Sequence, residues 1–96
     1  MAAYIGLMKM TEQGAKSIKE MPARVDANMK RFKEQGIEIK SWHLTMGRYD
    51  VVVMFEAKDD ETAARAALAI AGQGNAKTET LRAFSLDEAR KLVAGL

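Results

Sequence analysis

The segment from Leu44 to Phe55, LTMGRYDVVVMF, has the pattern of a β-hairpin that brings chemically capable side chains together. Apolar strand patterns flank Gly47 and Arg48, and a type II′ turn needs a positive φ at its first central residue, which glycine adopts readily. This turn pairs Leu44 with Val51, and the alternation of strand side chains then defines two faces. One face gathers four polar residues: Ser41, His43, Thr45 and Asp50.

His43 is the only histidine of the chain and the strongest candidate for acid-base chemistry. Oriented by the Asp50 carboxylate, it would act as a general acid or base, or as a haem or metal ligand. It could equally be a strand histidine that is hydrogen-bonded at a subunit interface. One histidine without any cysteine argues against a multi-ligand metal site within one subunit, and the residues identify no cofactor.

Tyr49 and Asp50 follow the turn and have a structural and a functional interpretation. Asp50 can accept backbone N–H groups of the turn, while Tyr49 packs its ring and hydrogen-bonds through its hydroxyl group. Turn chemistry alone explains these residue types. In the functional alternative, Asp50 orients His43 and the Tyr49 hydroxyl binds a ligand.

Arg82 lies in a strand pattern on the same side as Thr78 and Thr80, where an unpaired buried cation is costly. It therefore needs a partner, which is either Asp50, an acidic residue of another subunit, or an anionic ligand such as a carboxylate. Tyr4 is a further polar group on the side of Met8. The full set of candidate ligand-binding residues is Arg82, Tyr49, Tyr4, Thr45 and Met54, with Met8 and Val52 as apolar wall.

The elements that position these residues follow from the hydrophobic periodicity. Pro22 interrupts the first helical pattern, so a kink or a split is expected near Glu20. Ser85 and Glu88 form a capping box that starts a short final helix. Strands are expected at Ala2–Met10, Ile37–Met46, Asp50–Glu56 and Lys77–Phe84. Helices are expected after an N-cap at Thr11 as far as Gly36, and after an N-cap at Asp59 from Asp60 to about Ala71.

Length and composition describe one domain over residues 1–96. The net charge of +2 is spread along the chain, which does not favour nucleic-acid binding. The absence of cysteine excludes disulfides and thiolate nucleophiles, and no apolar run reaches the length of a membrane span. We expect a cytoplasmic protein.

The order β-α-β-β-α-β with right-handed crossovers predicts an α+β, ferredoxin-like antiparallel sheet with both main helices on one face. The first and third strands are apolar on both sides, so the face away from the helices is too apolar to remain in water. We therefore expect a homodimer, or an assembly of dimers, that packs two sheets face to face around a small cavity.

Several short motifs in a fixed order resemble the GYD domain family, whose Gly-x-Tyr-Asp pattern is occupied by Gly47, Tyr49 and Asp50. The other matching segments are Glu56-Ala57, Asp59-Asp60-Glu61, Gly74-Asn75 and 78–84. The resemblance covers nearly the whole chain and implies a bacterial, cytoplasmic, stand-alone protein with the dimeric α/β-barrel fold. The wider group includes monooxygenases without cofactors, haem-degrading enzymes, dehydratases and non-catalytic ligand binders, so the fold does not select an activity.

Three functions remain open from the sequence. The leading hypothesis is a binding or accessory module whose inter-sheet cavity holds a small, partly apolar or anionic molecule. The second is a small monooxygenase-like or dehydratase-like enzyme in which His43 acts as acid or base. The third is a structural oligomer without a ligand.

Overall fold

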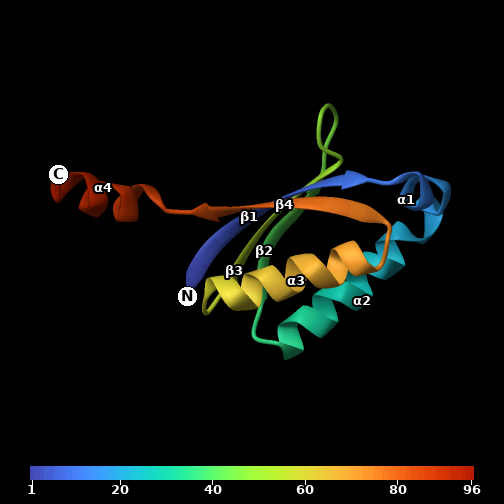
Figure 1. Cartoon of the computed structure of the whole chain (residues 1–96), viewed down its shortest axis with the longest axis horizontal. Coiled ribbons are helices and arrows are strands. Elements are labelled where there is room, and N and C mark those ends of the chain that lie inside the picture. Colours follow the sequence, from blue (N-terminus) through green and yellow to red (C-terminus); the bar gives the residue numbers. More distant parts are fainter.

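The structure, a computed structural model, describes all 96 residues and contains one four-stranded antiparallel sheet in the order β2-β3-β1-β4. Helices α2 and α3 cover one face of this sheet, and the other face, which we call the open face, is uncovered (Figure 1). This arrangement confirms the predicted ferredoxin-like α+β fold. The strands are β1 (Ala2–Met10), β2 (Glu38–Leu44), β3 (Val51–Ala57) and β4 (Ala76–Ala83).

The first helical region is divided, as Pro22 predicts. It consists of α1 (Glu12–Lys16), the 3₁₀ turn η1 (Ile18–Glu20) and α2 (Met21–Glu34). Pro22 lies in the first turn of α2, where its missing N–H is not needed. The Thr11 side chain caps α1 by accepting from the N–H of Gly14, and Gly36 follows α2 with a φ of 81°.

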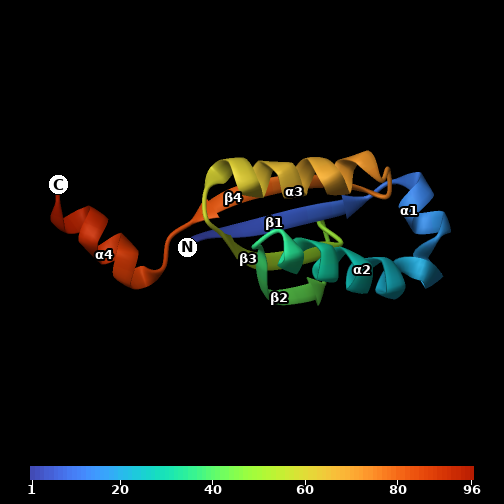
Figure 2. The ribbon, with the colours of Figure 1, turned by 90° about the horizontal axis from the view of Figure 1, so that it is seen from below.

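The two later helices also begin at the predicted caps. The Asp59 side chain accepts from the N–H of Thr62 at the start of α3 (Asp60–Gly72). Ser85 and Glu88 form both hydrogen bonds of a capping box at the start of α4 (Leu86–Ala94). Figure 2 shows α4 extending beyond the end of the sheet, separated from the remainder of the molecule.

The β2-β3 hairpin has the predicted register, since Leu44 pairs with Val51 and Trp42 with Val53. Gly47 has the positive φ that the turn requires, 101°. Both strands are shorter than expected at the turn, because the ladder stops at Leu44 and Val51. A register shift between Ile39 and Ser41 was not predicted.

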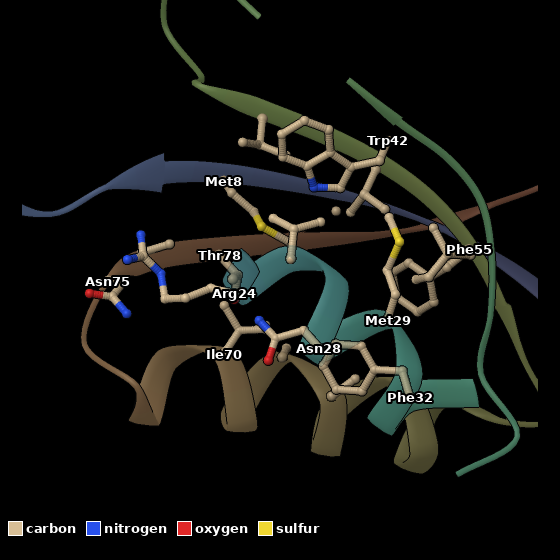
Figure 3. Close-up of a pocket in the computed structure, with 18 of the residues that line it drawn as sticks. Met8, Arg24, Asn28, Met29, Phe32, Trp42, Phe55, Ile70, Asn75 and Thr78 are labelled. Atoms are coloured by element: carbon tan, nitrogen blue, oxygen red, sulfur yellow. The ribbon is translucent and has the colours of Figure 1, made fainter. Parts of the chain in front are cut away.

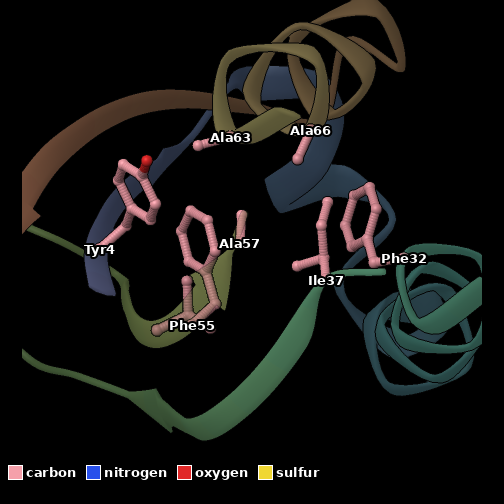
Figure 4. Close-up of a cluster of buried hydrophobic side chains, with 8 residues drawn as sticks. Tyr4, Phe32, Ile37, Phe55, Ala57, Ala63 and Ala66 are labelled. Atoms are coloured by element: carbon pink, nitrogen blue, oxygen red, sulfur yellow. The ribbon is translucent and has the colours of Figure 1, made fainter. Parts of the chain in front are cut away.

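The hydrophobic core lies between the sheet and the two main helices (Figure 4). Tyr4 stacks on Phe55 with a centroid separation of 5.3 Å. Small side chains of α3, Ala63 and Ala66, are buried against the sheet and allow the helix to approach closely. The remaining buried members are Phe32, Ile37, Val53 and Ala57.

The prediction that Tyr4 and Met8 face away from the helices is wrong. Tyr4 is buried in the core and Met8 packs against it, so this side of β1 faces α2 and α3. Because β1 is apolar on both sides, hydrophobicity does not distinguish them. Gly6 fits the helix side, since a Cβ there would lie 2.8 Å from Cγ1 of Val53.

The open face has an apolar centre, as the sequence predicts. Ile5 pairs with Met54 and with Leu81, and Leu7 pairs with Val52, on the side of the sheet opposite the buried residues. The members of this open-face patch are Ile5, Leu7, Val52, Met54 and Leu81. No helix of the chain is both long and apolar enough to span a bilayer.

Candidate functional site

The structure places His43 and Asp50 close along the hairpin but does not pair them. His43 is exposed on the open face opposite Val52. The Asp50 carboxylate instead accepts from the N–H of Met10 at 2.8 Å, and the N–H of Asp50 donates to the Met8 carbonyl at 2.8 Å. Asp50 therefore ties the hairpin to β1, rather than accepting from the turn itself as expected.

Side chains at both ends of the turn make hydrogen bonds that hold it in place. The Thr45 hydroxyl donates to the Tyr49 carbonyl at 2.6 Å, and the Tyr49 hydroxyl donates to a Glu79 carboxylate oxygen at 2.7 Å. This bond to Glu79 is the main reason that the pKa of Tyr49 is raised. Tyr49 thus makes the structural contact expected of its hydroxyl group, with β4 as the partner.

Tyr4 is only 3% exposed and lies on the helix side of the sheet. Its hydroxyl donates to Oδ1 of Asp60 at 2.6 Å, which joins β1 to the first turn of α3. Desolvation by burial, followed by the bond to Asp60, raises the pKa of Tyr4 to about 12. Tyr4 therefore cannot share an open-face site with His43.

Of the partners considered for Arg82, Asp50 is ruled out, because the two residues lie at opposite ends of β1. Arg82 pairs with Tyr4, whereas Asp50 contacts Met10. The Arg82 guanidinium donates to the carbonyls of Ala3 and Ala83 and lies 4.4 Å from the Phe84 ring centroid. Backbone carbonyls and aromatic faces thus partner the cation in place of a carboxylate.

A cavity of about 120 Å³ lies between the sheet and helices α2 and α3. Figure 3 shows Met8 and Trp42 on its sheet side and Asn28 and Ile70 on its helix side. The lining is mostly apolar, and the polar groups along it belong to Arg24, Asn28, Asn75, Thr78 and Thr80. This helix-side cavity is distinct from the inter-sheet cavity expected from the sequence.

Most of the residues around this cavity were not predicted as site residues, although one signal was present. Met21, Val25 and Met29 recur every four residues, which is the spacing of the apolar side of an amphipathic helix. Arg24 and Asn28 also recur at that interval, and both line the cavity beside the stripe. Polar residues next to an apolar stripe on the same helix were therefore the sequence signal for the rim of this cavity.

Comparison with known proteins gives the family. The sequence model of the GYD domain matches residues 4–93. The chain belongs to the GYD domain family. A relative from Thermus thermophilus, named "Glutamine synthetase and cystathionine beta-lyase binding protein", is 34% identical over 85 residues, which cover 88% of this chain and 90% of the relative.

The three residues from which the GYD domain takes its name have structural roles in this chain. Gly47 supplies the positive φ of the turn, Tyr49 bonds Glu79 of β4, and Asp50 bonds the backbone of β1. Together they hold the hairpin against two other strands. Beyond this anchored base, the side chain of Met46 at the turn is 99% exposed.

Proposed function

We propose that this GYD domain chain is a homodimeric, cytoplasmic accessory protein that binds metabolic enzymes through surface contacts. The observation that carries the proposal is the likeness along nearly the whole length of a protein whose name states that it binds glutamine synthetase and cystathionine beta-lyase. The hydrogen bonds of Asp50 to β1, which do not orient His43, weigh against the enzyme alternative.

The open face supports self-association. The open-face patch lies at the middle of a sheet with no covering layer, and Met54 within it is 46% exposed. Contiguous apolar surface of this kind on a soluble domain marks an interface. A second copy offers an identical apolar surface, so two sheets facing one another would remove both from water.

The hairpin turn supports contact with enzymes. Figure 1 shows it projecting from the sheet on the side away from the helices, and Met46 at the turn has no neighbours that cover it. Methionine is flexible and polarisable, so it adapts to differently shaped surfaces. A methionine at a projecting, anchored turn suits a protein that binds more than one enzyme.

The direct test is equilibrium binding between the purified chain and purified glutamine synthetase and cystathionine beta-lyase of the same organism. We expect saturable binding to at least one enzyme, and Met46→Asp should weaken it at least about tenfold by placing a charge in an apolar contact. Leu68→Asp, the same change at an exposed position on α3, is the matched control and should leave binding unchanged.

Two results would overturn this assignment. Absence of binding to both enzymes at near-millimolar concentration would contradict the accessory function. Equal binding by Met46→Asp and the unmodified chain would remove the turn from the contact. If Met46→Asp instead disrupts the dimer while binding to enzymes persists, the turn belongs to the self-association interface.

A second candidate function is favoured by the helix-side cavity. We infer that it accepts a small aromatic or aliphatic molecule. Arg24 donates through one guanidinium nitrogen to Ser17, which leaves its other nitrogens for a polar end, whereas the Asn28 amide is already bonded to Gln73. Apolar side chains around about 120 Å³ of unfilled space forgo the contacts that a filled core would make, which is a free-energy cost. An apolar ligand of one ring would recover part of this cost.

The test is thermal unfolding with toluene or benzoate as the probe. We expect either probe to raise the unfolding temperature of the unmodified chain, and a larger rise with benzoate would implicate Arg24. Ala67→Leu, which fills the cavity from α3, should abolish the response. Equal responses in both proteins, or none in the unmodified chain, would contradict ligand binding in this cavity.

A further inference from the structure

Helix α4 carries an apolar side that nothing in its own chain covers. Leu92 is 57% exposed and Val93 is 64% exposed, and no residue of α4 belongs to the hydrophobic core. At 100° per residue, the apolar residues occupy one side of the helix and the charged residues the other. The members of this apolar stripe are Leu86, Ala89, Leu92 and Val93.

The helix is locally well formed but too short to be stable alone. Its capping box satisfies two backbone groups, since Ser85 N donates to Glu88 at 3.0 Å and Glu88 N donates to the Ser85 hydroxyl at 3.1 Å. Isolated helices of this length are nevertheless marginal in water, because most helical stability in proteins comes from packing of an apolar side. The apolar stripe therefore needs a surface.

The start of α4 is held in its outward direction. Only Phe84 and Ser85 separate β4 from α4. Phe84 lies against the Arg82 guanidinium, which also donates to the Ala3 carbonyl at 3.2 Å and so fastens the end of β4 to β1. With this contact in place α4 points away from its own sheet, which leaves the apolar stripe free to meet another molecule.

The area of the open face favours a second copy as that molecule. Four strands about 4.8 Å apart and about eight residues long span only about 500 Å². A stable interface buries about 800 Å² on each partner. An exchanged helix about 14 Å long and 10 Å wide adds a footprint of about 280 Å² per protomer when each gives and receives one, which enlarges the contact by about half.

We propose that α4 is an exchanged arm whose apolar stripe packs against a second copy of this chain, beside the open-face patch. The proposal rests on the self-association proposed above and assigns a second element to it. Since each protomer gives and receives one arm, any defect in the stripe acts twice in every dimer.

The test compares two substitutions on the same helix by sedimentation equilibrium. Leu92→Glu places a charge in the apolar stripe, and Ala94→Glu places the same charge on the opposite, charged side. We expect Leu92→Glu to raise the dimer dissociation constant at least about a hundredfold and Ala94→Glu to change it less than about threefold. Neither residue is part of the core, so both variants should fold.

Nuclear Overhauser contacts in a mixed dimer of labelled and unlabelled protomers provide an independent measurement. We expect contacts between methyl groups of Leu92 or Val93 and the other protomer. A dimer of the unmodified chain that Leu92→Glu does not weaken would overturn the arm alone, whereas a monomeric unmodified chain would overturn self-association itself. Loss of enzyme binding in Leu92→Glu, with the dimer intact, would overturn the arm and assign the stripe to the enzyme contact instead.

Discussion

At the scale of single residues, Tyr4 shows how a side chain taken from sequence as a ligand contact can be structural. Its place in the first strand was correctly predicted. The side of the sheet that it faces was not, because β1 is apolar on both sides. What decides the matter is the tertiary position of Asp60, whose carboxylate accepts the hydroxyl proton at 2.6 Å. That partner lies on another element and has no local signal in the sequence.

Tyr4 gives a prediction for stability at alkaline pH. Its pKa is raised from 10.0 to about 12 in the folded chain, so its neutral form stabilises the fold fully below pH 10 and this contribution is lost as the pH rises towards 12. Tyr4→Phe should cost about 1 kcal/mol near neutral pH. The difference in unfolding free energy between Tyr4→Phe and the unmodified chain, measured with urea, should narrow above pH 10. A difference that stays constant with pH would contradict the raised pKa of Tyr4.

Asp50 and His43 lie near one another in the hairpin but should contribute differently to stability. Asp50→Ala leaves the Met10 N–H without its acceptor and should cost about 1 to 2 kcal/mol of unfolding free energy. His43→Ala, at an exposed position of the same hairpin, should change it by less than about 0.5 kcal/mol. Equal losses in the two variants would show that Asp50 does not anchor the hairpin.

At the scale of elements, the sequence predicts the boundaries that local chemistry determines. The Thr11, Asp59 and Ser85 caps and the division near Pro22 all appear where expected, because each depends on residues within one helical turn. The register shift in β2 and the cavity beside α2 depend on how elements meet. Neither has a signature within a single strand or helix.

Helix α1 packs closely against the loop before β4, a contact that the sequence does not predict. Gly14 is buried, and a Cβ there would overlap the carbonyl oxygen of Asn75 in the loop before β4. Gly14→Ala should therefore cost about 1 to 3 kcal/mol in chemical unfolding, as overpacking does. Gly72→Ala in α3, where a Cβ meets open space, should instead be neutral or stabilising by up to about 1 kcal/mol. Similar losses in both would contradict the close junction.

At the scale of the whole molecule, the chain is elongated, because α4 extends beyond the end of the sheet. The extents are 49 × 31 × 18 Å, and the long dimension includes α4. The sequence predicts the apolar open face, since successive apolar residues in β3 must place some of their side chains away from the helices. The outward direction of α4 was not predictable, because the capping box at Ser85 determines where the helix begins and not where it lies relative to the sheet.

Self-association through the open face also gives a prediction at this scale. Met54→Glu places a charge within the open-face patch and should raise the dimer dissociation constant at least about a hundredfold. Leu68→Glu, on the outer side of α3, should leave it unchanged. Far-ultraviolet circular dichroism of both variants checks that the monomer fold is retained. If both variants weaken the dimer equally, the added charge acts regardless of its position, and the open-face patch is not the interface.

The most direct test of the account is sedimentation equilibrium of the unmodified chain from low micromolar to near-millimolar concentration. We predict a species of twice the 10.6 kDa chain mass, present throughout the upper part of this range. A single species of 10.6 kDa at the highest concentration would show that the open face remains in water and would contradict the account.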